Sequence, residues 1–333
     1  MLRLFFLIVA FLGILSDGST SCVAAGYDPM TIPDSFESQT LDVEVTDSKR
    51  DRVIPVRVYL PESPSPQPVI LFSHGMGGDR EASPYLGNHW SARGYVVVFL
   101  QHAGSDSAIW RNVPLGERMP AMRRAASGQN FLERNSDVAA VLDQLTQWNQ
   151  ADDHILKGRL DLDHVGMSGH SFGAKTTQAV SGQSAIGGIG NATEKRIDAA
   201  IAMSPSPPRR GDPATAFGEV AIPWMLMTGT KDTGNFSDQT VESRRSVYPA
   251  LPPGDKYELL LDGAEHAAFG ERPERRLRSG PTQRGKRNHH RAIQALSTAF
   301  WDSYLRNDKT AKDWLTGHGP RSVLEADDRF QSK

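Results

Sequence analysis

The feature that most constrains the fold of this chain is a series of short apolar runs separated by more polar segments. Residues 69–72, 96–100 and 224–227 consist entirely of apolar side chains. Continuous runs of this kind are typical of strands that are covered on both faces, as in parallel sheets. Strands are predicted over 41–47, 53–60, 68–74, 95–101, 163–169, 197–204, 222–229 and 256–263.

Helical patterns alternate with these strands. The segment 136–148 has apolar residues at helical spacing, with Ser136 as its expected N-cap. A second helix is expected directly after residue 171, and a third over 290–305. Strands that alternate with helices predict an α/β fold, with a mainly parallel central sheet and helices on both faces.

No linker-like segment divides the chain, so a single domain is expected over residues 26–333. The segment 105–135 interrupts the strand–helix rhythm and is interpreted as an insertion that borders a pocket or acts as a lid. Residues from about 306 onward lack a clear pattern and are expected to form a C-terminal tail.

The N-terminus has the features of a secretory signal peptide. Arg3 precedes the apolar run Leu4–Leu15, which is too short to span a bilayer comfortably. Val23 and Ala25 occupy the small-residue positions of a cleavage site. We therefore expect cleavage after Ala25 and a secreted or periplasmic protein, with an uncleaved anchor as the alternative. Cys22, the only cysteine, lies in this leader, so no disulfide or cysteine nucleophile is expected in the mature chain.

The overall charge gives no reason to expect a polyanionic partner. The 333 residues carry 37 Lys and Arg against 39 Asp and Glu, a formal net charge of −2. The charged fraction of 23% and hydrophobic fraction of 38% are typical of a globular protein. We expect no nucleic-acid partner and no stable membrane span.

The clearest functional signal is "GHSFG", Gly169–Gly173. A strand-like run ends just before Ser171 and a helical pattern begins just after it. This strand–turn–helix context is typical of a nucleophile elbow, in which the two flanking glycines leave room for a sharp turn. A serine in an ordinary turn is the alternative. The context favours Ser171 as a catalytic nucleophile.

A serine hydroxyl is a weak nucleophile near neutral pH unless a base accepts its proton. In folds with this elbow, the acid and then the histidine follow the serine along the chain. Asp232 and His266 each follow a late strand in that order, and Asp262 and Glu265 compete for the role of the acid. The competing histidines, none of which follows a late strand, are His164, His289, His290 and His318.

An oxyanion that forms beside Ser171 would need two hydrogen-bond donors. The backbone N–H of Phe172 directly follows the nucleophile. The second expected donor is the backbone N–H of Met76, in the glycine-rich loop after the strand at 68–74. His102 and Asp106, after the strand at 95–101, either line the pocket or form structural hydrogen bonds.

In these motifs the chain resembles the α/β-hydrolase superfamily, and more narrowly its dienelactone-hydrolase-like and platelet-activating-factor-acetylhydrolase-like branch. The resemblance covers roughly residues 40–305. Its motifs are "VILFSHGMGGDRE" (69–81), "YVVVFLQHAGSDS" (95–107), "RNSDVAAVLDQL" (134–145), "GMSGHSFGAKT" (166–176), "GTKD" (229–232) and "EHAAF" (265–269).

The resemblance implies hydrolysis of carboxylic esters through an acyl-enzyme, with Ser171, Asp232 and His266 as the triad and without a metal or organic cofactor. Dienelactone hydrolases have a cysteine nucleophile where this chain has serine, so lactone specificity is not expected. The acetylhydrolases imply short acyl groups. We therefore expect a serine esterase acting on a small-molecule or lipid-like ester. The alternatives are a serine peptidase or amidase of the same fold, and an exported binding protein without activity.

Overall fold

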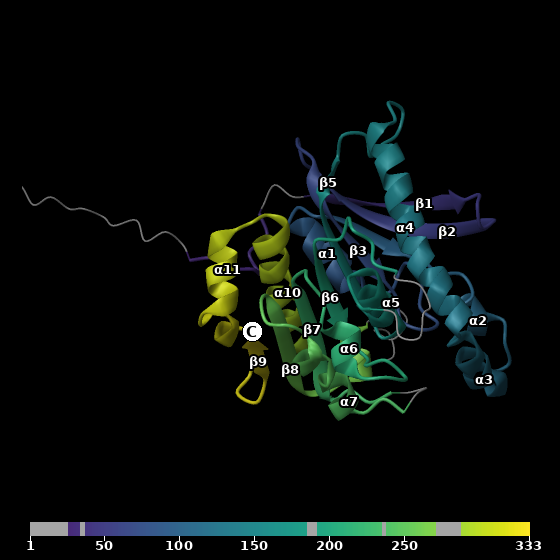
Figure 1. Cartoon of the computed structure of the whole chain (residues 1–333). Coiled ribbons are helices and arrows are strands. Elements are labelled where there is room, and N and C mark those ends of the chain that lie inside the picture. Colours follow the sequence, from purple (N-terminus) through teal and green to yellow (C-terminus); the bar gives the residue numbers. More distant parts are fainter. Residues whose placement is uncertain (1–25, 34–36, 185–191, 235–237, 271–287) are drawn as a thin grey trace, which may run out of the picture.

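A nine-stranded mixed sheet forms the centre of the protein in the computed structural model (Figure 1). The structure describes residues 26–33, 37–184, 192–234, 238–270 and 288–333. The signal peptide expected over residues 1–25 lies outside this part of the chain. The strands are β1 (Ser38–Asp47), β2 (Arg52–Pro61), β3 (Gln67–Ser73), β4 (Val96–Leu100), β5 (Leu160–His170), β6 (Ala199–Met203), β7 (Trp224–Lys231), β8 (Lys256–Glu265) and β9 (Arg329–Ser332).

The predicted α/β class is confirmed, and the sheet is mostly parallel. Its strand order is β1-β2-β4-β3-β5-β6-β7-β8-β9. The strands from β4 to β8 in this order pair in parallel, whereas β1 with β2, β2 with β4, and β8 with β9 pair antiparallel. The carboxyl ends of the parallel strands therefore lie along one edge of the sheet, where side chains distant in sequence can meet.

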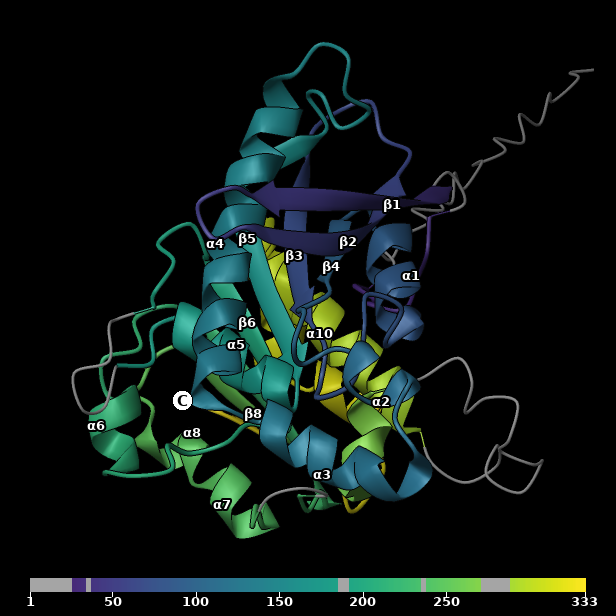
Figure 2. The same cartoon turned by 90° about the vertical axis from the view of Figure 1, so that its right-hand side faces the viewer.

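Helices cover both faces of the sheet because side chains on its inner strands alternate between two cores. On β3, Phe72 packs with Trp90 of α1 (Pro84–Ala92) and with α10 (His289–Leu305). Its neighbour Leu71 packs on the opposite face with Leu142 of α4 (Gly128–Gln150). Figure 2 shows α4 and α10 on opposite sides of the sheet. In the described ranges, no helix combines the length and apolar character needed to cross a membrane.

Shorter helices complete the structure. α5 (Phe172–Val180) follows β5 and packs against β3, β5 and β6. The remaining helices are α2 (Ala108–Arg111), α3 (Leu115–Ala125), α6 (Pro213–Phe217), α7 (Val241–Arg245), α8 (Val247–Ala250), α11 (Lys309–Thr316) and the 3₁₀ turns η1 (His266–Phe269) and η3 (Gly319–Ser322).

The helix expected from Ser136 begins two turns earlier. Ser127 is its N-cap and accepts a hydrogen bond from the amide of Asn130 at 3.1 Å. Ser136 is therefore an interior residue of α4. The early turns escaped prediction because polar side chains, including Arg134, are buried there and interrupt the apolar periodicity. The expected insertion at 105–135 consists of α2, α3 and these first turns of α4.

The expectation of a C-terminal tail is wrong. The residues after 306 form α11, η3 and β9, and β9 pairs antiparallel with β8 as an edge strand. The ring of Phe330 stacks on that of Tyr257, with centroids 5.9 Å apart. β9 is short and mostly polar, so it lacks the continuous apolar run that identified the inner strands.

A substitution of Trp301 in α10 tests the packing on one face of the sheet. Its ring lies edge-on to Trp90, with centroids 5.8 Å apart, and against Gly166 of β5, where a Cβ would lie 2.9 Å from the ring. Because Trp301 is fully buried, Trp301→Ala should lower the free energy of unfolding by about 3–5 kcal/mol. Leu115→Ala, at a side chain that is 80% exposed, should change it by less than about 0.5 kcal/mol. Urea unfolding measures both, and equal effects would contradict this account of the core.

Candidate active site

Ser171 lies in a sharp turn between β5 and α5. Its backbone has φ 58° and ψ −110°, an uncommon conformation for a residue with a side chain. The turn is tight because its neighbours lack side chains. A Cβ on Gly173 would lie 1.8 Å from the carbonyl oxygen of Ser73, and one on Gly169 would lie 2.5 Å from that of Gly173. The predicted strand–turn–helix context is thus present, and it requires these two glycines.

The structure brings the three predicted triad residues together. The Oγ of Ser171 lies 2.9 Å from Nε2 of His266, and Nδ1 of the same ring lies 2.7 Å from Oδ1 of Asp232. Because an ionised carboxylate only accepts hydrogen bonds, Nδ1 carries the proton and Nε2 is free to accept the serine hydroxyl. The arrangement therefore provides a serine whose proton has an acceptor in place.

Asp232 is fully buried, and several donors compensate its charge. Its Oδ2 accepts hydrogen bonds from the hydroxyls of Ser204 at 2.7 Å and Thr228 at 2.9 Å. The Nε of Arg244 lies 3.0 Å from Oδ1. Burial raises the pKa of Asp232, but the hydrogen bond from His266 and the charge of Arg244 outweigh it and hold the pKa below its usual range. Asp232 is therefore ionised at neutral pH.

The competing residues are engaged elsewhere or exposed. Asp262 accepts a hydrogen bond from Thr230 at 3.1 Å, and Glu265 is exposed. His164 pairs with Asp161, His289 bonds the carbonyl of Asp262, His290 stacks on Tyr85, and His318 lies before η3. Asp232 is thus the acid that contacts His266.

The two predicted oxyanion donors belong to segments that adjoin Ser171. Phe172 is the first residue of α5, so its N–H is one of the amides that a helix leaves unbonded. Met76 follows Gly75, and a Cβ at Gly75 would lie 3.4 Å from Cβ of Ser171. Within the described residues, neither the Met76 nor the Phe172 amide donates to a protein acceptor. Their role as an oxyanion hole stays a prediction.

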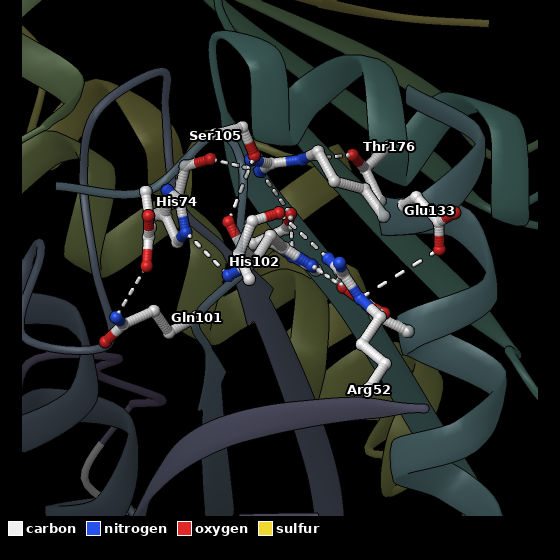
Figure 3. A network of polar contacts seen from close by, with 12 residues as sticks. Arg52, His74, Gln101, His102, Ser105, Glu133 and Thr176 are labelled. Atoms are coloured by element: carbon white, nitrogen blue, oxygen red, sulfur yellow. Dashed lines mark hydrogen bonds and ion pairs between the residues drawn. The ribbon is translucent and has the colours of Figure 1, made fainter. Parts of the chain in front are cut away.

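His102 forms structural hydrogen bonds, the second of the two roles considered for it. Its Nε2 lies 2.9 Å from the hydroxyl of Ser73, and its Nδ1 lies 2.9 Å from Asp137 (Figure 3). This serine–histidine–aspartate chain has the same connectivity as the one at Ser171, but all three side chains are fully buried. Asp106 accepts a hydrogen bond from Gln101 at 2.8 Å and is also buried.

His170 is a site residue that the sequence did not single out. Its Nε2 lies 3.0 Å from the carbonyl oxygen of His266, and the two rings lie 4.7 Å apart. Burial, with a further contribution from His266, lowers the pKa of His170 to about 3. The neutral ring can donate from Nε2 and so fixes the backbone that carries His266. Its position next to Ser171 was visible in the sequence, but its partner, 96 residues away, was not.

Comparisons with known proteins found no match, either to a family model or to a curated protein. The chemistry of the site therefore rests on its own geometry. A hydroxyl with a bonded imidazole, a buried carboxylate behind that imidazole and two nearby amides can carry out nucleophilic attack on a carbonyl carbon.

Buried histidines should make the protein sensitive to acid. Burial lowers the pKa of His89 and of His102 to about 4, below the ordinary value of 6.5. In the unfolded chain each of these histidines binds a proton near pH 6.5, whereas in the folded protein it stays neutral until about pH 4. Protonation between these two pH values therefore favours the unfolded chain. The free energy of unfolding is unaffected above pH 6.5 and decreases as the pH falls toward 4.

His89→Gln tests this account at a position remote from the site. The glutamine amide can replace the contact of His89 Nε2 with the hydroxyl of Thr298, which is 3.0 Å long. Between about pH 6 and pH 4.5, the slope of unfolding free energy against pH should fall by about 1.4 kcal/mol per unit, the equivalent of one proton. Urea unfolding at fixed temperature measures the slope, and an unchanged slope would show that His89 is not neutral in the folded protein.

Proposed function

We propose that the protein is a serine hydrolase of the α/β-hydrolase type that cleaves carboxylic esters. The observation that carries this proposal is the pair of contacts of His266, 2.9 Å to Ser171 and 2.7 Å to Asp232. Ser171 follows β5, Asp232 follows β7 and His266 follows β8. All three therefore lie at the edge of the sheet where the carboxyl ends of the parallel strands meet. The mostly parallel sheet, the sharp turn at Ser171 and the order serine, aspartate, histidine support the same fold type.

The proposed reaction begins when Ser171 Oγ attacks the ester carbonyl carbon and its proton passes to Nε2 of His266. Asp232 stabilises the imidazolium and keeps the ring oriented. The carbonyl oxygen becomes an oxyanion that accepts hydrogen bonds from the amides of Met76 and Phe172. When the carbon–oxygen bond to the alcohol breaks, His266 returns the proton to the leaving alcohol. Water, activated by the same histidine, then attacks the acyl-enzyme and releases the acid.

The residues of the chain supply every proton transfer in this scheme, so it needs no metal or organic cofactor. The substrate class we propose is a small-molecule or lipid-like ester with a short acyl group. Export through the N-terminal segment belongs to the same proposal. It would place the enzyme in the periplasm or outside the cell.

Three variants test the assignment of roles. Ser171→Ala should remove essentially all ester hydrolysis, because it removes the hydroxyl that forms the acyl-enzyme. Asp232→Asn should lower kcat by about 10⁴, because the wrong tautomer of His266 is then favoured. Asp262→Asn, at the competing acid bonded to Thr230, is the control and should retain nearly full activity. Initial rates on p-nitrophenyl esters from acetate to palmitate measure all three.

The same series distinguishes the substrate classes. Activity that peaks at short chains and is lost in Ser171→Ala supports the proposal, whereas a peak at long chains indicates a lipase. A folded Ser171→Ala variant with undiminished activity contradicts the role of Ser171. Hydrolysis of amides but not esters would indicate the amidase alternative. Absence of both, from a folded sample, would indicate a binding protein.

A further inference from the structure

Arg134 of α4 joins three segments beneath the site. Its guanidinium donates from Nε to the hydroxyl of Thr176 at 3.0 Å, and from Nη1 to the hydroxyl of Ser105 at 3.0 Å. Its Nη2 donates to the hydroxyl of Ser73 at 2.8 Å and to the carbonyl oxygen of His74. Figure 3 shows that His74, Ser105 and Thr176, which come from different parts of the chain, lie near one another. One side chain thus ties the end of β3 and the loop after β4 to α5.

A cation in this position is costly, because Arg134 is fully buried. The acceptors that it contacts in the described residues are all uncharged. The carboxylate of Asp137 instead pairs with Arg52 at 2.7 Å and with His102 at 2.9 Å. Burial lowers the pKa of Arg134 to about 9, which leaves the guanidinium charged at neutral pH. An apolar side chain would fill the space without this cost, so the directed hydrogen bonds of Arg134 need a reason.

The bond to His74 acts on the loop that carries Met76. The Nε2 of His74 accepts a hydrogen bond from the amide of His102 at 3.0 Å, so the ring proton is on Nδ1. Nδ1 then donates to the carbonyl oxygen of Gly75 at 2.7 Å. In a planar trans peptide, the carbonyl and the following N–H point in opposite directions. Fixing the carbonyl of Gly75 therefore aims the N–H of Met76, while Arg134 fixes the peptide just before it.

The other contacts of Arg134 act on the helix that carries Phe172. The guanidinium lies over the ring of Phe172, 4.7 Å from its centroid. Thr176, one helical turn further on, accepts from Nε of Arg134 and donates to the carbonyl of Phe172 at 3.3 Å. Arg134 is thus in contact with both sides of the predicted oxyanion hole.

We propose that Arg134 is a positioning residue that sets the distance and direction between the amides of Met76 and Phe172. It acts through the β3 loop and the first turn of α5 and does not contact the reacting atoms. The inference rests on the proposed function, because an oxyanion must form between these two amides for their spacing to matter.

Two matched variants distinguish a positioning role of Arg134 from a contribution to the stability of the fold alone. Thr176→Val and Ser105→Ala each remove one hydroxyl acceptor from the same buried guanidinium. Thr176 holds the helix of one oxyanion donor, whereas Ser105 lies in a loop that carries neither donor. The backbone carbonyl of Ser105, which accepts from the amide of Gly77 at 2.8 Å, remains in the alanine variant. Arg134→Lys, which keeps the charge but loses the fork of donors, is the third variant.

The readout is the rate at which a fluorophosphonate probe labels Ser171, followed by mass spectrometry, with thermal unfolding measured for each variant. This reaction requires the nucleophile and the oxyanion donors. It can be measured without knowing the natural substrate. We expect labelling of Thr176→Val to be about tenfold slower than that of Ser105→Ala, and labelling of Arg134→Lys to be about 10² slower than wild type.

A second measurement does not depend on the amount of folded enzyme. It is the ratio of the rates on p-nitrophenyl acetate and on its thionoester, in which sulfur replaces the carbonyl oxygen. Misplaced amides lose their preference for oxygen, so this ratio should fall in Thr176→Val and stay at the wild-type value in Ser105→Ala.

Equal labelling rates and equal ratios for these two variants would overturn the positioning role while leaving the proposed function intact. Wild-type labelling by folded Arg134→Lys would overturn it as well. If the probe does not label Ser171 in the wild type, the proposed function fails, and the inference fails with it.

Discussion

The site depends on the close contact between the turn after β5 and the end of β3. A side chain on Gly173 would collide with the carbonyl of Ser73, so the two backbones can approach only through glycine. The approach places the loop at Gly75 against Ser171 and leaves the first amides of α5 beside the same hydroxyl. It also brings Ser73 to the guanidinium of Arg134. Nucleophile, donor loop and supporting network thus follow from one steric constraint.

Two chains of serine, histidine and aspartate show that connectivity alone does not define a catalytic site. Ser73, His102 and Asp137 have nearly the same distances as the triad at Ser171. Ser73 is fully buried, however, and its oxygen already accepts a hydrogen bond from Arg134. Ser171 is partly exposed, and the segments that adjoin it carry two amides, those of Met76 and Phe172, without protein acceptors in the described residues. Access and unused donors, rather than the chain of bonds, distinguish the candidate site.

The sequence predicted those parts of the structure that have local signals. The inner strands have continuous apolar runs, and Ser171, Asp232 and His266 each follow such a run, so the structure brings them together as expected. β9 and the early turns of α4 lack an apolar pattern and were missed. The role of Arg134 was missed for a different reason. A buried arginine on a helix looks like a surface residue until the segments that supply its acceptors, 29 to 61 residues away, are in place.

A second buried arginine, Arg244, stabilises the part of the site around Asp232. Arg244 donates to the carbonyl oxygens of Ser204 at 2.8 Å and Asp232 at 2.8 Å, and its Nη2 lies 3.3 Å from Nδ1 of His266. Through these carbonyls it joins the ends of β6 and β7, as Arg134 joins those of β3 and β4 to α5. Where parallel strands end, carbonyl groups leave the sheet without ladder partners and need donors. A guanidinium has five N–H groups in a rigid fork and can satisfy several carbonyls at once. The desolvation of each arginine is thus offset by the acceptors it satisfies, which are backbone carbonyls for Arg244 and three hydroxyls with one carbonyl for Arg134.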